Sequence, residues 1–249
     1  MTEKTYRKIE LDLCSAPDLN LSITSSGEDY VGPAPTKMTL IKRIKMENSC
    51  SSVCHHNDET YAAVFCKGIM KINKLGEVSS AYDDPYDISG MKVLKGRLYY
   101  TRNSERGNLL VYGIQNKQHL SSWSVSDDGH TWPGCRMCFI GEELAVADRE
   151  NRRITLYTTN GEEIRHFACN SITHHGSLVI CRAEQQSIII SDEPSSTVLK
   201  LNLISGEIEW KSTCVPQPQA VTCDLSGYVL VASKSEVPTL SVLDSKTGK

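Results

Sequence analysis

The chain has 249 residues, a length that suits one large domain or two small ones. Hydrophobic residues make up 39% and charged residues 23% of it, which excludes the low-hydrophobicity, high-charge composition of a disordered protein. The net charge of −3 gives no reason to expect DNA or another polyanion as a partner.

The N-terminal residues 1–14 mix acidic and basic side chains where a signal peptide would need an apolar core. No uninterrupted apolar run approaches the roughly 18 residues that cross a bilayer. We therefore expect a cytoplasmic protein that does not engage a membrane.

The cysteines are scattered through the chain, which favours free thiols over a disulfide framework. Two groups resemble metal ligands at first sight. Cys50 and Cys54 are followed by two histidines, but no second pair accompanies them at zinc-finger spacing. Cys135 and Cys138 lie three residues apart in a predicted strand, so they point to opposite faces. We expect no metal and no other cofactor.

A short apolar, β-rich run recurs every 36 to 46 residues. Each run is apolar on both sides of the pleat, which is typical of a central strand with a neighbouring sheet on either side. Four-stranded propeller blades produce this recurrence, whereas helical repeats would need amphipathic segments of period 3.6. The runs are YAAVF (61–65), RLYYT (97–101), ELAVA (143–147), SIIIS (187–191) and YVLVA (228–232).

Each unit has the same internal order. One apolar strand precedes the run, a polar turn and a third strand follow it, and a glycine-containing turn leads to an outer strand. The outer strand is clearest in NGEEIRHF (160–167) and SGEIEW (205–210). The sequence thus predicts an all-β propeller of five or six four-stranded blades.

Strands from the two ends of the chain are expected to close the ring. The last unit stops after its third strand and the next turn, and MTLIKRIKM (38–46) looks like an outer strand. Residues 6–30 offer a further strand or two in YRKIELDL and NLSITS. Pairing of the termini removes an exposed sheet edge, so we expect closure by an N-terminal strand. The expected division is a tail at 1–35, able to contribute strands, and a propeller at 36–249.

The best-preserved unit reads LAVADRENRRITLYTTNGEEI at 144–164. Asp148 and Asn151 can bond to the backbone of the tight turn after the second strand, and Arg153 can pair back to Asp148. We therefore expect these three residues to form a structural turn motif.

This segment resembles the NHL repeat, a family whose propellers most often have six blades. By strand pattern the resemblance covers roughly 200 residues. The chain also resembles the C-terminal propeller of tripartite-motif NHL proteins, ubiquitin ligases that carry a RING, B-boxes and a coiled coil ahead of it. None of those modules is recognisable here, so the resemblance implies a propeller that recognises substrates while ubiquitin transfer depends on other modules.

Catalytic motifs are missing from the sequence. It has no GxSxG, GxxxxGK[ST] or HExxH motif and no clean dinucleotide fingerprint. The acidic pairs Asp83–Asp84 and Asp127–Asp128 lie in turns, where solvated side chains are the simpler interpretation. We expect a non-catalytic recognition scaffold for protein partners, with an RNA-binding propeller as the first alternative and a metal-dependent channel enzyme as the second.

In a propeller, the loops between second and third strands share one face with the loops between blades, and we expect partners to bind there. The charged residues that we assign to these loops sum to −4, which disfavours RNA. A local basic corner from the arginines of 149–153 and a nearby tryptophan keeps RNA as the second hypothesis. The predicted partner-binding residues are Arg102, Trp132, Arg149, Arg152, His174 and His175.

Overall fold

The structure is a computed structural model that describes residues 22–23, 44, 46, 48–84, 86, 88–102, 108–124, 136–148, 151–172, 178–184, 186–223, 228–234 and 239–249. All regular structure within these ranges is β-strand. The described part of the chain contains no helix with the length and hydropathy needed to cross a bilayer.

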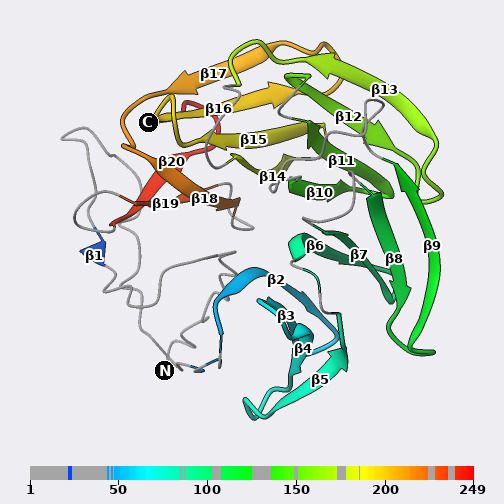
Figure 1. The fold of residues 1–249 in the computed structure, drawn as a ribbon. Coiled ribbons are helices and arrows are strands. Elements are labelled where there is room, and N and C mark those ends of the chain that lie inside the picture. The colour runs from blue at the N-terminus through cyan, green and yellow to red at the C-terminus, as the bar shows by residue number, and fades with distance from the viewer. Residues whose placement is uncertain are drawn as a thin grey trace, which may run out of the picture.

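The strands form five four-stranded sheets that follow one another around a common centre, so the predicted all-β propeller is confirmed and it has five blades (Figure 1). Blade 1 contains β2 (Cys50–His56), β3 (Glu59–Val64), β4 (Gly68–Ile72) and β5 (Val78–Tyr82). Blade 2 contains β6 (Ile88–Leu94), β7 (Arg97–Arg102), β8 (Asn108–Gly113) and β9 (Gln118–Ser124). Blade 3 contains β10 (Arg136–Ile140), β11 (Glu143–Asp148), β12 (Arg153–Tyr157) and β13 (Glu163–Ala168). Blade 4 contains β14 (Leu178–Glu184), β15 (Ser187–Asp192), β16 (Thr197–Asn202) and β17 (Ile208–Ser212). Blade 5 contains β18 (Pro218–Cys223), β19 (Tyr228–Ser233), β20 (Thr239–Asp244) and, from the N-terminal end, β1 (Ser22–Ile23).

The recurring apolar runs are the second strands of the blades, and β15 shows why they are apolar on both faces. All six of its residues are buried. Ile188 and Ile190 pack into a cluster shared with blade 3, while Ile189 packs into a cluster shared with blade 5. The middle of the strand lies between two sheets and is apolar on both faces, which explains the absence of strict alternation, whereas the buried polar residues Ser187, Ser191 and Asp192 lie at its ends.

Four hydrophobic clusters each unite two neighbouring blades. The blade 2–3 cluster, for example, brings Tyr99 and Leu109 together with Leu144 and Tyr157. Tyr99 also meets Phe139 edge-on, with ring centroids 5.0 Å apart. Each blade is therefore stabilised chiefly by its neighbours, as expected where one sheet cannot bury both of its faces alone.

The interface between blade 5 and blade 1 is built differently. Blade 5 presents a cluster that includes Leu230 and Leu240, and blade 1 presents a separate one that includes Val64. Met46, which precedes blade 1, packs on the second cluster. Among the described residues, no single hydrophobic cluster unites blade 5 with blade 1.

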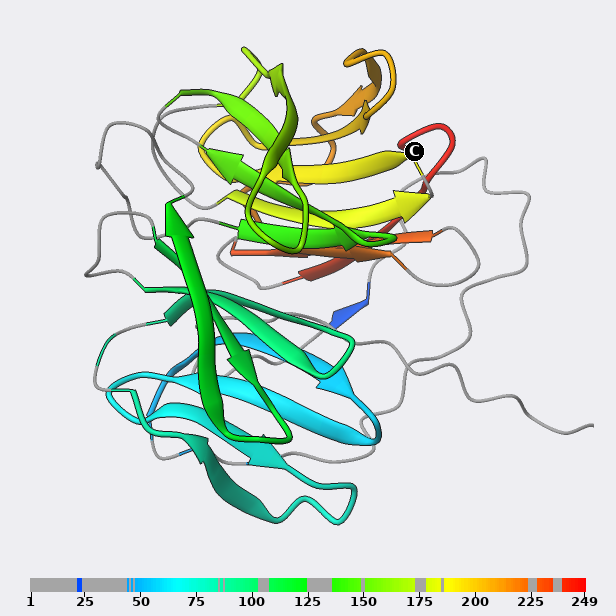
Figure 2. The same ribbon diagram turned by 90° about the vertical axis from the view of Figure 1, so that its right-hand side faces the viewer.

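An N-terminal strand completes the fifth sheet, as predicted. Strand β1 lies at the outer edge of β20 and pairs with it in parallel, Ser22 opposite Thr239 and Ile23 opposite Leu240 (Figures 1 and 2). It comes from the NLSITS segment. The outer strand expected at 38–46 lies largely outside the described residues.

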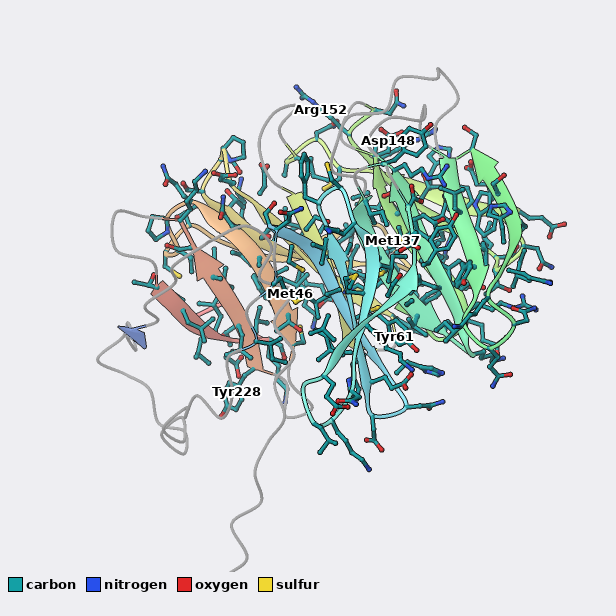
Figure 3. The ribbon with its side chains drawn as sticks, turned by 60° about the horizontal axis from the view of Figure 1, so that its bottom comes forward. Met46, Tyr61, Met137, Asp148, Arg152 and Tyr228 are labelled. Atoms are coloured by element: carbon teal, nitrogen blue, oxygen red, sulfur yellow. The ribbon has the colours of Figure 1, made fainter. Side chains whose placement is uncertain are left out.

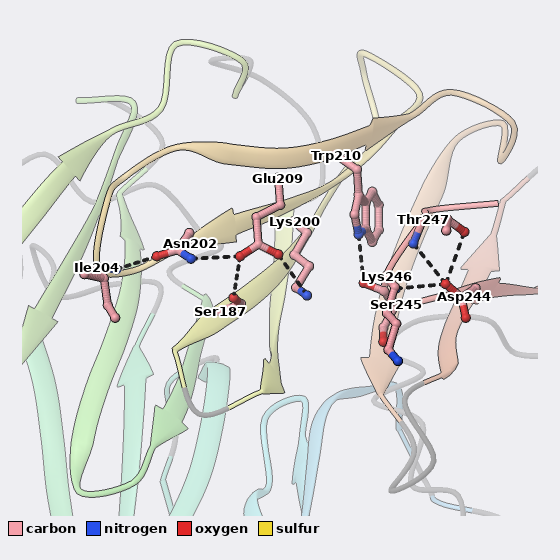
Figure 4. Close-up of polar contacts among 10 residues, drawn as sticks. All are labelled: Ser187, Lys200, Asn202, Ile204, Glu209, Trp210, Asp244, Ser245, Lys246 and Thr247. Carbon is pink, nitrogen blue, oxygen red and sulfur yellow. Dashed lines mark hydrogen bonds and ion pairs between the residues drawn. The ribbon is translucent and has the colours of Figure 1, made fainter.

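An aromatic side chain of an outer strand rests on a glycine of the next blade at three successive interfaces. A Cβ atom built on the glycine would lie 2.5 to 2.9 Å from the aromatic ring, and each glycine has a positive φ. The indole Nε1 of Trp210 also donates a hydrogen bond to the Ser245 carbonyl oxygen at 2.8 Å (Figure 4). These positions therefore require glycine for space as well as for backbone conformation. The pairs are Trp123 with Gly161, Phe167 with Gly206, and Trp210 with Gly248.

We expect Gly248→Ala to destabilise the fold more than Gly96→Ala, because the two glycines have φ values of +70° and +71° but only the first contacts a ring. The left-handed backbone should cost each variant about 1–2 kcal/mol. The clash with Trp210 should cost Gly248→Ala a further ~1–3 kcal/mol. Urea unfolding measures the stability of each variant. An equal loss of stability in the two variants would contradict a steric role for the contact between Gly248 and Trp210.

Blade 4 contains a charged side chain that is almost fully buried. Lys200 is 4% exposed, and its Nζ lies 2.9 Å from Oε2 of Glu209 on the outer strand (Figure 4). The other carboxylate oxygen accepts hydrogen bonds from Asn202 Nδ2 at 2.9 Å and Ser187 Oγ at 3.1 Å. Burial raises the pKa of Glu209, but the bonds from Lys200, Asn202 and Ser187 outweigh it, so the net pKa is lowered.

The pKa of Glu209 is lower in the folded protein than in the unfolded chain, so the ionised carboxylate stabilises the folded state. This stabilisation is complete above the pKa of the unfolded chain and is lost as the pH falls through the pKa of the folded protein. We expect Glu209→Gln to reduce the free energy of unfolding by about 1–3 kcal/mol at neutral pH. The difference from the unsubstituted protein should shrink in acid. Glu207→Gln is the control, because the Glu207 carboxylate makes none of these contacts, and it should change stability by less than about 0.5 kcal/mol. If Glu209→Gln lowered the free energy of unfolding by the same amount at every pH, this account would be contradicted.

Candidate recognition face

Within each blade, strands that follow one another along the chain are antiparallel, so the loops between second and third strands emerge on the same side as the loops that lead to the next blade. We call this side the recognition face. Of the predicted partner-binding residues, Arg102 and Arg152 are described and lie on it. The others, Trp132, Arg149, His174 and His175, lie outside the described residues.

The turn after β11 is held by Asp148, which is 8% exposed. One of its carboxylate oxygens accepts a hydrogen bond from the backbone N–H of Asn151 at 3.1 Å. The other accepts from Asn151 Nδ2 at 2.8 Å and from Arg153 Nε at 3.3 Å. The turn also places Arg152 in the left-handed region, with φ of 48°. Figure 3 shows Asp148 and Arg152 at the same edge of the molecule. The residues predicted as a turn motif thus contact one another through the carboxylate.

Blade 4 keeps the aspartate but changes its partners. Asp192 is completely buried and accepts a hydrogen bond from Ser195 Oγ at 2.6 Å. Thr197 Oγ1 in turn donates to the Ser195 carbonyl oxygen at 3.1 Å. Short hydroxyl side chains therefore fix this turn without the Asn and Arg of blade 3.

Blade 2 reverses the charge pattern. Arg102 ends the second strand, where blade 3 has Asp148, and its partner comes from the loop between blades 1 and 2. Its Nε and Nη2 atoms each lie 2.9 Å from Oδ2 of Asp84, which is 2% exposed. Oδ1 of Asp84 accepts from the backbone N–H of Tyr86 at 3.0 Å. The interpretation of Asp84 as a solvated turn residue is therefore wrong, whereas its neighbour Asp83 is exposed.

The Arg102 guanidinium also stacks on an exposed aromatic ring. Its Cζ lies 5.0 Å from the ring centroid of Tyr86, whose residue is 43% exposed. A buried carboxylate, a guanidinium and a tyrosine thus form one connected group, in which the tyrosine is held in place and accessible. Sequence reasoning missed this group because Asp84 and Tyr86 lie in the loop between blades 1 and 2, whereas Arg102 ends the second strand of blade 2, 18 residues after Asp84.

The buried aspartates change the charge that the recognition face presents to solvent. Asp84, Asp148 and Asp192 contribute to the sum of −4 for its loops, yet none is more than 8% exposed and each is hydrogen-bonded. The sum also counts Arg102 and Arg153 as positive, and these arginines are largely buried against Asp84 and Asp148, so the two pairs cancel. Of the three aspartates, Asp192 alone makes the sum more acidic than the exposed surface. Besides Tyr86, the described exposed side chains include Phe65, at 49%, and Lys67.

Residues that could hold a metal do not gather among the described ones: no group of three or more His, Cys, Asp or Glu side chains there has suitable geometry. The seven cysteines whose side chains the structure describes are thiols that form no disulfide with one another, and Cys54, Cys138 and Cys169 are buried. Burial raises the pKa of the Cys169 thiol. Comparison with known proteins finds no matching family model and no match among curated proteins.

We expect Asp148→Asn to destabilise the protein by about 2–4 kcal/mol, because the substitution leaves the largely buried Arg153 without its carboxylate. Asp83→Asn is the matched control on the same face and should change stability by less than about 0.5 kcal/mol. Thermal or urea unfolding measures the free energy of unfolding of both variants. Similar stability of the two variants would show that the turn does not depend on the ion pair.

Proposed function

We propose that this protein is a non-catalytic scaffold that binds protein partners through its recognition face. The observation that carries the proposal is the group of Asp84, Arg102 and Tyr86, which holds an exposed tyrosine and an arginine in fixed positions. Tyrosine and arginine dominate the binding energy of protein interfaces. A side chain that is already ordered loses less entropy on binding, so this arrangement favours recognition.

A narrower role rests on the resemblance of residues 144–164 to the NHL repeat. We propose on that basis that the propeller selects substrates for ubiquitin transfer by other modules, as in tripartite-motif proteins, within the cytoplasm. RNA is the second candidate ligand of the same face, because the arginines of residues 149–153 form a local basic group in the sequence.

Crosslinking and mass spectrometry from cell lysate can separate these candidates. We expect Tyr86→Ala to lower the recovery of specific protein partners by about tenfold or more, the loss typical of a central interface residue. The control is Leu75→Ala, which changes a 68%-exposed side chain in the turn between β4 and β5, on the opposite face.

Equal recovery of proteins with Tyr86→Ala, Leu75→Ala and the unsubstituted protein would count against this face as the binding surface. Crosslinked nucleotides, lost as the salt concentration rises, would instead identify the RNA-binding function.

A further inference from the structure

The turn between β16 and β17 presents an apolar side chain to solvent on the side opposite the recognition face. Ile204 in this turn is 57% exposed, and Ile208 at the start of β17 is 40% exposed. The turn is ordered, because Oδ1 of Asn202 accepts hydrogen bonds from the backbone N–H groups of Ile204 at 2.8 Å (Figure 4) and Ser205 at 3.1 Å. The isoleucine is thus held in place by hydrogen bonds in which its side chain has no part.

Equivalent turns in other blades show that this position does not require an apolar residue. In blade 5, Oδ1 of Asp244 accepts a hydrogen bond from the backbone N–H of Lys246 at 2.9 Å, so Lys246 stands where blade 4 has Ile204. In blade 1, Oδ1 of Asn73 accepts from the backbone N–H of Leu75 at 3.0 Å, so Leu75 has the same position there. The geometry of the turn therefore does not explain an exposed isoleucine in blade 4.

The apolar surface at this turn continues onto blade 3. A Cβ atom built on Gly206 would lie 2.9 Å from the ring of Phe167, so the turn rests on the outer strand of blade 3. Ile208 pairs with Leu201, a member of the hydrophobic cluster shared by blades 3 and 4, and therefore lies on the side of the sheet that faces blade 3. Phe167, Ile204 and Ile208 thus lie at the outer end of the interface between these blades, and we call them the rim patch.

Charged side chains of both signs flank the rim patch. Cζ of the exposed Arg165 lies 5.2 Å from the ring centroid of Phe167. The exposed Lys211 pairs with Leu199, so it also lies on the side of β17 that faces blade 3. The exposed Glu207 directly precedes β17. Within the described ranges, none of these three charged side chains takes part in an ion pair.

An apolar centre flanked by both signs of charge is complementary to itself. In a two-fold interface each surface meets an identical surface, so the acidic part of one copy faces the basic part of the other. Glu207 of one copy can therefore face Arg165 and Lys211 of the second copy while the apolar side chains meet near the axis. A partner that carried only one sign of charge would oppose like charges on part of this surface.

We propose that the rim patch is a two-fold self-association surface that binds a second copy of this chain. Association would remove the exposed area of Ile204 and Ile208 from water, and the ordered turn would limit the entropy that is lost on binding. The turn lies opposite the recognition face, so both recognition faces of a dimer stay accessible. Two linked faces would bind a divalent partner more tightly than one face alone.

Sedimentation velocity over a concentration series tests the proposal. We expect a monomer–dimer equilibrium with a dissociation constant of about 10–100 µM, as for a small interface. Ile204→Lys should weaken association by about tenfold or more, because it places a charge at the apolar centre. The variant should fold, since blade 5 has lysine in the same turn.

The matched control is Leu75→Lys, which makes the same change at the same turn position of blade 1 and should leave association unchanged. A protein that stays monomeric up to about 500 µM, far above the expected dissociation constant, would overturn the proposal. Equal association of the Ile204→Lys and Leu75→Lys variants would also overturn it.

A charge exchange tests the two-fold arrangement. Glu207→Lys makes the three flanking charges positive, whereas Arg165→Glu combined with Lys211→Glu makes them negative. Each variant alone should lose self-association, but a mixture of the two should form a heterodimer at least as tight as the unsubstituted dimer. No association in the mixture would contradict a two-fold interface. Tyr86→Ala should leave dimer formation unchanged, so the rim patch and the recognition face can fail independently.

Discussion

The structure depends on one constraint: each sheet is apolar on both faces, so each must be covered on both sides by other parts of the chain. Four interfaces satisfy this constraint by merging the side chains of two blades into one cluster. Hydrophobic association has no preferred direction, so it holds the sheets together without fixing their relative positions. Specific contacts fix the relative positions of the blades. The Trp210 ring of blade 4, for example, lies against Gly248 of blade 5, and only glycine allows so close an approach.

The same arrangement determines where recognition can occur. Buried side chains fill the space between neighbouring blades, so their sequence is constrained by packing. The loops at the two ends of the sheets are exposed, and their sequence can vary without disturbing the core. On the recognition face these loops are ordered by carboxylates that are themselves buried, such as Asp148 and Asp192. A buried carboxylate stabilises a turn only when its partners are complete, so the loops gain rigidity together with a dependence on a few hydrogen bonds. Rigid loops are well suited to presenting Tyr86 to a partner.

Much of the fold could be predicted from the sequence, because local strand patterns repeat. The second strands were identifiable from apolar residues on both faces, and Asp148 with its turn could be recognised from residues that are close in sequence. Asp84 and Arg102 could not, since they are 18 residues apart in different structural contexts and Arg102 occupies a position that is acidic in blades 3 and 4. The N-terminal strand was expected within the NLSITS segment, but its two described residues leave no periodicity from which its parallel register on β20 could be predicted.

The recognition face depends on side-chain chemistry because its backbone groups are already engaged within turns. The backbone N–H of Tyr86, for example, donates a hydrogen bond to Oδ1 of Asp84, so selectivity at this position must come from the tyrosine ring and the Arg102 guanidinium beside it. The turn and the side chain that it presents are thus specified by different residues. Substitution of an exposed loop side chain can therefore change the partner while the buried carboxylate keeps the loop in place.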